Sequence, residues 1–132
     1  MKLLLDTNVC VDLFRGRPEI LARLEKVVPG DCAISAVTAF ELRTGILRCS
    51  QPERELKKLE RLLAMISVLP FDKAAGDHSA RIRHDLEKGG RRIGPYDTLI
   101  AGHAVSAGLT LVTNNTGEFS RIAQLALENW GQ

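Results

Sequence analysis

Residues 1–8 read MKLLLDTN, an apolar run followed by an aspartate, and this pattern is the starting point for predicting the fold. Three consecutive leucines predict a strand over residues 2–5 that is buried on both faces, because such strands are continuously apolar rather than alternating. Asp6 follows directly, so its carboxylate is expected at the edge of a core, where a charge is costly unless another group satisfies it. The position of Asp6 therefore points to a dedicated role for this carboxylate.

Beyond this strand, predicted helices and strands alternate along the chain. Further strands are predicted at residues 32–35, 67–71, 109–113 and, at an edge, 125–130. Helices are predicted at residues 7–14, 18–28, 37–47, 52–66, 73–88 and 97–108, with a loop at 114–119. Ser50 is a predicted cap for the fourth helix and Asp72 for the fifth. The alternation predicts an α/β fold, a three-layer α/β/α sandwich with a mainly parallel central sheet.

Composition limits the class of protein. The 132 residues are 45% apolar, which is typical of a folded chain, and we expect one domain over residues 1–132. The net charge of +2 neither requires nor excludes a nucleic-acid partner. The sequence has no signal-peptide pattern and no apolar run near the roughly 20 residues of a membrane span. Its cysteines (Cys10, Cys32 and Cys49) are odd in number and widely spaced, which favours free thiols in the cytoplasm over disulfides or zinc.

Four acidic residues fall where parallel strands would end. Asp6 ends the first strand, Glu41 lies in the helix after the second, and Glu118 lies in the loop after residues 109–113. Asp97 begins the helix before that last strand and could reach the same edge, where open α/β sheets bind their ligands. Carboxylates gathered there would repel one another unless a cation neutralised them, and oxygen ligands favour Mg²⁺ or Mn²⁺. Such a site can activate water for phosphodiester hydrolysis.

Each of these acids also has a plainer interpretation. A single carboxylate is often a helix cap or a solvated side chain, and Asp12 is expected at the surface. His103 lies among small helical residues and is predicted to be packed rather than catalytic. The basic loop that contains Arg91 and Arg92 lies just before Asp97, so these side chains either contact RNA phosphates or are simply solvated.

Four motifs add a resemblance that covers nearly the whole chain. They are LLLDTNVCVDL (residues 3–13), ISAVTAFELRTGI (34–46), IGPYDTLIAGHA (93–104) and LVTNNTGEF (111–119). In this order they resemble the PIN-domain ribonucleases of the VapC toxin family, from VapBC toxin–antitoxin pairs. One motif would be weak, whereas four in order are specific. The chain differs from the family pattern at Gly117, where a basic residue is common, and at Glu118, where aspartate is frequent.

The resemblance implies a PIN-like fold and a Mg²⁺-dependent endoribonuclease that leaves a 5′-phosphate and a 3′-hydroxyl. It implies catalytic roles for Asp6, Glu41, Asp97 and Glu118, with Asp6 and Asp97 as metal ligands and the two glutamates acting directly or through water. It implies supporting roles for the polar neighbours Thr7, Asn8, Thr113 and Asn115. The expected partners are RNA, with tRNA a common target class, a VapB-like antitoxin and a second copy of the chain.

Two other functions stay open at this point. One is a PIN-domain nuclease of RNA processing that has no antitoxin, and the other is a non-catalytic α/β module that binds nucleic acid or a partner.

Overall fold

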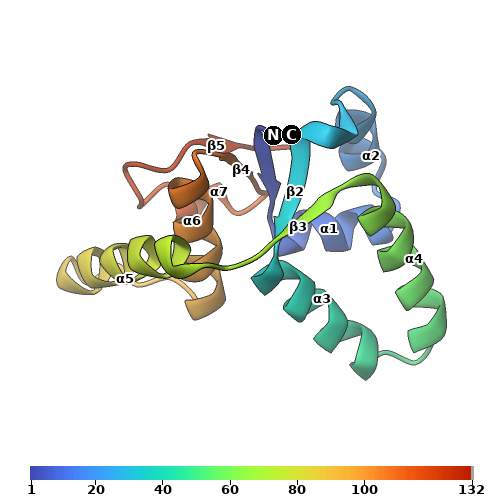
Figure 1. The fold of residues 1–132 in the computed structure, drawn as a ribbon, viewed down its shortest axis with the longest axis horizontal. Helices are drawn as coiled ribbons and strands as arrows, with labels where there is room; N and C mark the ends of the chain where they lie inside the picture. Colours follow the sequence, from blue (N-terminus) through green and yellow to red (C-terminus); the bar gives the residue numbers. More distant parts are fainter. Residues whose placement is uncertain (132) are drawn as a thin grey trace.

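A computed structural model describes residues 1–131 of the chain, and its elements alternate as the sequence predicts (Figure 1). The strands are β1 (Leu3–Leu5), β2 (Cys32–Ser35), β3 (Ser67–Leu69), β4 (Thr110–Val112) and β5 (Leu127–Glu128). The α-helices are α1 (Thr7–Phe14), α2 (Pro18–Glu25), α3 (Ala36–Arg48), α4 (Pro52–Met65), α5 (Lys73–Lys88), α6 (Pro95–Ala107) and α7 (Thr116–Phe119), and a 3₁₀ turn spans Pro29–Asp31.

The strands form one sheet in the order β3-β2-β1-β4-β5, and every described pair is parallel. The first strand is therefore the central one, where Leu4 pairs with Ala33 of β2 on one side and with Leu111 of β4 on the other. Since all strands run the same way, their carboxyl ends lie along a single edge of the sheet. The predicted mainly parallel α/β sandwich is confirmed.

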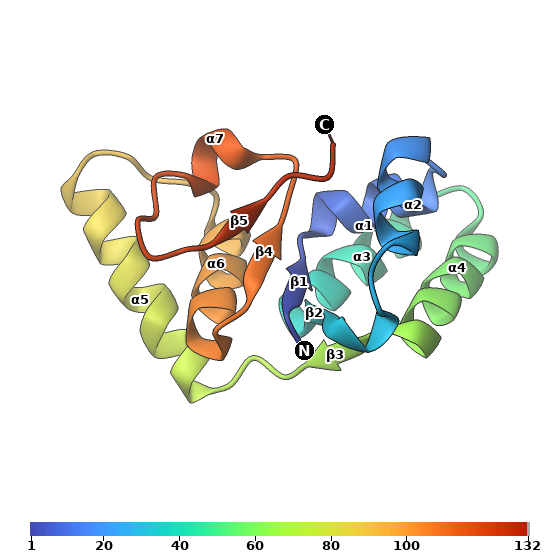
Figure 2. The same cartoon turned by 90° about the horizontal axis from the view of Figure 1, so that it is seen from above.

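Alternating side chains of the sheet supply two separate cores. Leu5 and Val112 face the layer that contains α1 to α4, whereas Leu4 and Leu111 face the layer that contains α5, α6 and α7. Figure 2 shows these helices on opposite sides of the strands. Because every inward position of β1 is apolar, the run of leucines is explained by burial on both faces.

The helix limits differ from prediction at several points. The second helix ends at Glu25 rather than residue 28, and the expected loop after β4 contains the one-turn helix α7. Gln51, not Ser50, is the N-cap of α4, and it makes no side-chain capping bond. Proline supplies the start of this helix instead, because its fixed φ and missing N–H suit the first position.

Helices α5 and α6 pack unusually closely, as the small residues of α6 suggest. A Cβ on Gly102 would lie 1.9 Å from Ser79 Oγ and 2.6 Å from the Ser79 backbone nitrogen. The Ser79 hydroxyl donates a hydrogen bond to Ala75 O at 2.8 Å within its own helix. A side chain at position 102 is therefore incompatible with this spacing of the two helices.

Asp72 caps α5 as predicted, since its Oδ1 accepts a hydrogen bond from Ala75 N at 2.9 Å. Asp72→Ala is expected to lower the free energy of unfolding by about 1 kcal/mol, the usual effect of losing an N-cap. The RNA cleavage that the resemblance implies should be unchanged, because this cap lies at the opposite end of α5 from the loop that leads into α6. Urea denaturation and a cleavage assay on the same preparation test both expectations.

Within residues 1–131, no helix has the length and apolar character that a membrane span requires.

Candidate active site at the carboxyl edge of the sheet

Asp6 is the most buried acidic side chain at the edge where the strands end. It is 1% exposed and follows β1 as the N-cap of α1. Its Oδ1 accepts a hydrogen bond from Thr7 N at 2.7 Å, and its Oδ2 accepts one from Thr113 Oγ1 at 2.8 Å. Because Thr113 directly follows β4, the central strand β1 and its neighbour β4 together hold this carboxylate.

Glu41 reaches the same edge from the neighbouring strand. The Ser35 side chain at the end of β2 caps α3 by accepting a hydrogen bond from Val37 N at 3.0 Å. This start places Glu41 in the second turn of the helix, where its Oε1 accepts a hydrogen bond from Thr7 Oγ1 at 2.8 Å. Buried Thr38 lies beside the same hydroxyl, at 3.1 Å between the two oxygens.

Asp97 and Glu118 complete the acidic group from the other layer. Asp97 lies in the first turn of α6 and Glu118 in α7, and the negative charge of Glu118 raises the pKa of Asp97. Asn115 Nδ2 donates a further hydrogen bond to Glu118 Oε2 at 3.2 Å. The structure therefore brings together all four acids that the sequence singled out.

The acids influence one another electrostatically. Burial raises the pKa of Asp97 to about 6, and the negative charges of Asp6, Glu118 and Glu41 raise it as well. Burial also raises the pKa of Asp6, although the hydrogen bonds from Thr113 and Thr7 oppose this effect. Among residues 1–131, no Lys, Arg or His forms an ion pair with any of the four. The group therefore carries excess negative charge that a cation would relieve.

This charge predicts a pH dependence of the metal-free protein. The folded state holds a proton on Asp97 up to about pH 6, whereas the unfolded chain releases it near 3.8. Stability from this group is therefore greatest below pH 3.8 and is lost as the pH rises through about 6. Thermal unfolding in EDTA should show this decline for the wild type, and Asp97→Asn should reduce it. An unchanged decline in the variant would contradict the assignment.

The donor set suits a hard divalent cation, because it consists of carboxylate oxygens. Cys10 lies near Asp6 but is fully buried, and burial raises the pKa of its thiol, so it stays neutral. As the side chains stand, no three His, Cys, Asp or Glu residues within 1–131 are positioned to hold a metal ion together. A divalent ion would bind the ionised form of these carboxylates, so its binding would compete with protonation of Asp97.

The remaining predicted residues are placed differently. Asn8 is exposed and makes no side-chain hydrogen bond to Asp6 among the described residues, so its supporting role stays a prediction. Arg91 and Arg92 are exposed, and Arg92 forms an ion pair with Glu87, with 3.8 Å between Nε and Oε2. His103 is buried with Nδ1 2.8 Å from Ser35 Oγ, and burial lowers its pKa, so it is packed as predicted.

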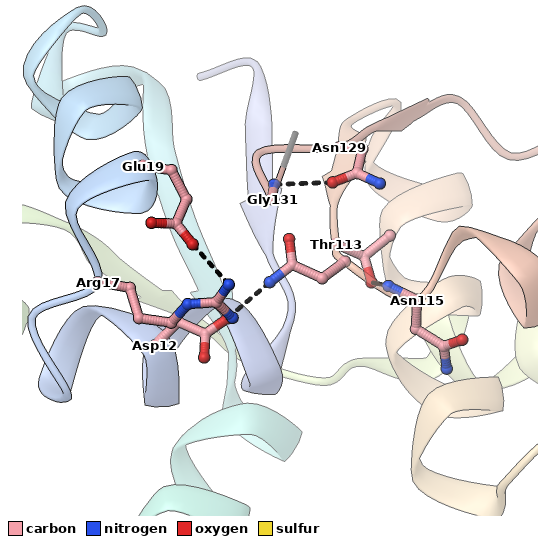
Figure 3. A network of polar contacts seen from close by, with 8 residues as sticks. Asp12, Arg17, Glu19, Thr113, Asn115, Asn129 and Gly131 are labelled. Carbon is pink, nitrogen blue, oxygen red and sulfur yellow. Dashed lines mark hydrogen bonds and ion pairs between the residues drawn. The ribbon is translucent and has the colours of Figure 1, made fainter.

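Asp12 was expected at the surface, and this prediction is wrong. The residue is 8% exposed, and its Oδ2 accepts hydrogen bonds from Asn114 Nδ2 at 2.6 Å and Arg17 Nη1 at 3.1 Å (Figure 3). Sequence reasoning did not select Asn114 at all. A signal was available, because Val9 and Asp12 are three residues apart and so share the buried face of α1. These contacts join α1, the start of α2 and the loop after β4.

Comparison with known proteins assigns the family. Residues 3–125 match the model of the PIN domain. The chain is 42% identical over 130 residues to a tRNA(fMet)-specific endonuclease VapC of Shigella flexneri, and the match covers 98% of both proteins. It is 37% identical over 131 residues to ribonuclease VapC2 of Haemophilus influenzae, again covering 98% of each.

Solved structures give the same result. VapBC2 of Rickettsia felis, bound to a DNA fragment from its promoter, contains a chain with a TM-score of 0.93 and 35% identity. The likeness covers 98% of this chain and 99% of that one. DNA-bound VapBC of Salmonella typhimurium gives a TM-score of 0.93 at 39% identity and 98% coverage of both. With this fold and this acidic edge, the chain belongs to the PIN-domain VapC ribonucleases, the endoribonuclease toxins of VapBC toxin–antitoxin systems.

Proposed function

We propose that this toxin is a Mg²⁺-dependent endoribonuclease, with Mn²⁺ as an alternative ion, whose catalytic groups are Asp6, Glu41, Asp97 and Glu118. The observation that carries the proposal is the convergence of four carboxylates, coupled in charge and without a basic partner among the described residues, at one edge of the sheet. A bound divalent ion would supply activated water and would stabilise charge on the phosphodiester. The products would carry a 5′-phosphate and a 3′-hydroxyl.

The surrounding residues have distinct roles in this proposal. Asp6 and Asp97 bind the ion directly, and the two glutamates bind it directly or through water. Thr113 and Thr7 hold Asp6 and Glu41 in place through their hydroxyl groups. Asn115 orients Glu118 through its side-chain amide. Hydrogen bonds of this kind keep carboxylate ligands in a fixed direction before the ion binds.

The substrate class is proposed from a relative. The Shigella flexneri protein is named as specific for tRNA(fMet), and we propose tRNA as the target class here. Purified protein should cleave a tRNA(fMet) transcript in Mg²⁺ and lose this activity in EDTA. Mapping cleavage of total cellular RNA after brief induction would then identify the preferred target. Cleavage that persists in EDTA would overturn the metal-dependent mechanism, whereas cleavage confined to other RNAs would overturn the tRNA proposal.

The basic loop before α6 is proposed to contact RNA phosphates. Arg91 and Arg92 are exposed and precede Asp97 by a few residues. Replacing both with glutamine should weaken RNA binding for all sequences. It should also reduce the salt dependence of binding, because a protein that makes fewer phosphate contacts releases fewer counterions when it binds RNA. The test is to measure the affinity for tRNA from low to high salt. The control is Arg81→Gln, which removes an exposed arginine from α5. An unchanged salt slope would place the RNA elsewhere.

An antitoxin partner is proposed on the same grounds as the substrate. The Rickettsia felis and Salmonella typhimurium relatives were solved as VapBC complexes. A groove of about 630 Å³ between α1, α3 and α4 is lined by Thr7 and Glu41 and by apolar side chains that include Phe14 and Ile46. A partner segment with an apolar anchor and one basic side chain would fit both the groove and the acidic group.

Co-expression with the small protein encoded upstream, where one exists, should yield a stable complex that no longer cleaves RNA. Asp6→Asn should weaken the basic contact but preserve the apolar anchoring, so this variant should still co-purify. A neighbour that neither co-purifies nor suppresses cleavage would remove the antitoxin assignment for that protein.

A homodimer is proposed through the outer face of α3 and the start of α6. Phe40 of α3 and Tyr96 of α6 are about half exposed and pack against each other, with 5.6 Å between ring centroids. Leu47, which also lies in α3, is 80% exposed. Large apolar side chains gathered in this way are typical of interfaces. Phe40→Ser together with Leu47→Ser should yield monomers in analytical ultracentrifugation. A dimer that persists in this variant would place the interface on another surface.

A further inference from the structure

We propose that Asp12 is a positioning residue for RNA cleavage, because its carboxylate fixes Asn114 and through it the loop that supports two catalytic acids. The inference rests on the proposed roles of Asp6 and Glu118. It concerns a contact outside the acidic group itself, between α1 and the loop that follows β4.

Asp12 makes two charge-assisted contacts through one oxygen atom. Its Oδ2 accepts a hydrogen bond from Asn114 Nδ2 at 2.6 Å and another from Arg17 Nη1 at 3.1 Å. Its side chain is 11% exposed, whereas that of Arg17 is 45% exposed. The contact with Asn114 is therefore the better shielded of the two, and hydrogen bonds to a shielded carboxylate are stronger than those in water.

Asn114 lies between the two residues that serve the catalytic acids. Thr113 donates to Asp6 Oδ2 at 2.8 Å, and Asn115 donates to Glu118 Oε2 at 3.2 Å. Asn115 N also donates to Thr113 Oγ1 at 2.9 Å, which leaves the threonine hydroxyl hydrogen free to point at Asp6. A shift of Asn114 would therefore disturb both acids at once.

The contact with Asp12 sets the orientation of the side-chain amide of Asn114. A carboxylate can accept hydrogen bonds but cannot donate them, so the amide must present its nitrogen. The Oδ1 atom of Asn114 then points the other way, and within residues 1–131 this buried oxygen has no hydrogen-bond partner. Gly131 packs against this oxygen so closely that a Cβ there would lie 2.8 Å from it. The amide is thus held between Asp12 on one side and Gly131 on the other.

Asp12 acts through geometry rather than as a further metal ligand. Its Oδ2 is already occupied by two donors. Loss of Asp12 should therefore misalign the catalytic acids without removing a ligand.

The experiment compares Asp12→Ala, Asn114→Ala and the double variant in steady-state cleavage of a tRNA(fMet) transcript. Each single variant should lower kcat about 10-fold to 100-fold with little change in KM, as is usual for residues that orient metal ligands. The double variant should lose no more than either single one, because both remove the same hydrogen bond. Asp12→Asn keeps an oxygen that can accept from Asn114 and should recover part of the loss.

A second readout does not depend on activity. Calorimetric titration with Mn²⁺ alone should show weaker binding in Asp12→Ala and Asn114→Ala than in the wild type. Two matched controls should bind Mn²⁺ normally: Glu19→Gln, which removes the exposed partner of Arg17, and Asp72→Ala, which removes a distant cap. All assays are run below the melting temperature of every variant.

Contradictory outcomes separate the two proposals. Normal cleavage and normal Mn²⁺ binding by folded Asp12→Ala and Asn114→Ala would overturn the positioning role, and so would losses that simply add. A rise in KM with unchanged kcat would overturn it too, because the loop would then bind RNA rather than align the acids. If Asp12→Ala does not fold, the results for Asp12→Asn and Asn114→Ala decide whether Asp12 has the positioning role. Full cleavage by Asp6→Asn would instead overturn the proposed catalytic site.

Discussion

Asp6→Asn is expected to reduce RNA cleavage at least about 100-fold, because losing a ligand should cost more than losing the residue that orients it. The asparagine keeps the shape of a side chain that is 1% exposed and held by Thr7 and Thr113. The fold should therefore survive. Stability near neutral pH should be equal to or greater than that of the wild type, because burial already disfavours the charge and raises the pKa of Asp6.

Cleavage of a tRNA transcript and urea denaturation of the same preparation test this pair of expectations. Glu41→Gln and Asp97→Asn should show similar losses of activity. Asp72→Ala also removes an aspartate, but one that caps a helix outside the site, so this variant should cleave RNA normally. A folded Asp6→Asn protein that retains full activity, after repurification to exclude a contaminating nuclease, would refute the proposed site.

Gly102→Ala is expected to have the largest effect on stability, at least about 3 kcal/mol, which is the upper end of the usual cost of overpacking. The new methyl carbon would lie 1.9 Å from Ser79 Oγ and 2.6 Å from both Ser79 Cα and N. A hydroxyl can rotate away, but backbone atoms of a helix cannot. Relief therefore requires α5 and α6 to separate, which would open the core around Ile82 and Ile100.

Two further variants make this test specific. Ser79→Ala together with Gly102→Ala should recover little, because the contacts with the Ser79 backbone remain. Gly45→Ala lies within α3, where a Cβ would meet nothing within 4 Å, and should stabilise the protein by up to about 1 kcal/mol. Circular dichroism melts of the three variants give the comparison. A Gly102→Ala protein as stable as the wild type would show that the two helices can shift apart at little cost.

The sequence predicted the strands and the acidic edge because both depend on local patterns. A leucine run followed by aspartate locates β1 and the position where it ends, and parallel strands bring distant ends together. The same reasoning placed Glu41 and Asp97 correctly at that edge. It also led to Asp72 as a cap, since a capping aspartate needs just its own helix.

What could not be predicted depends on contacts between distant residues. The partner of Asp12 is Asn114, 102 positions away, and nothing in either local segment names the other. The one-turn helix α7 is too short for an apolar period to be visible, so Thr116–Phe119 was expected to be a loop. The hydrogen bond from Thr7 to Glu41 likewise joins residues 34 positions apart. Such contacts follow from the packing of layers and not from spacing along the chain.

The central place of the first strand has a consequence for the protein during its synthesis. Asp6 emerges from the ribosome early, but Thr113, which donates a hydrogen bond to its carboxylate, is 107 residues behind it. The same delay applies to β4, which pairs with β1 in the finished sheet. The nascent chain therefore cannot assemble the acidic group until almost all of it has been translated. As long as the ribosome is still building this toxin, the acidic edge of its sheet is therefore incomplete.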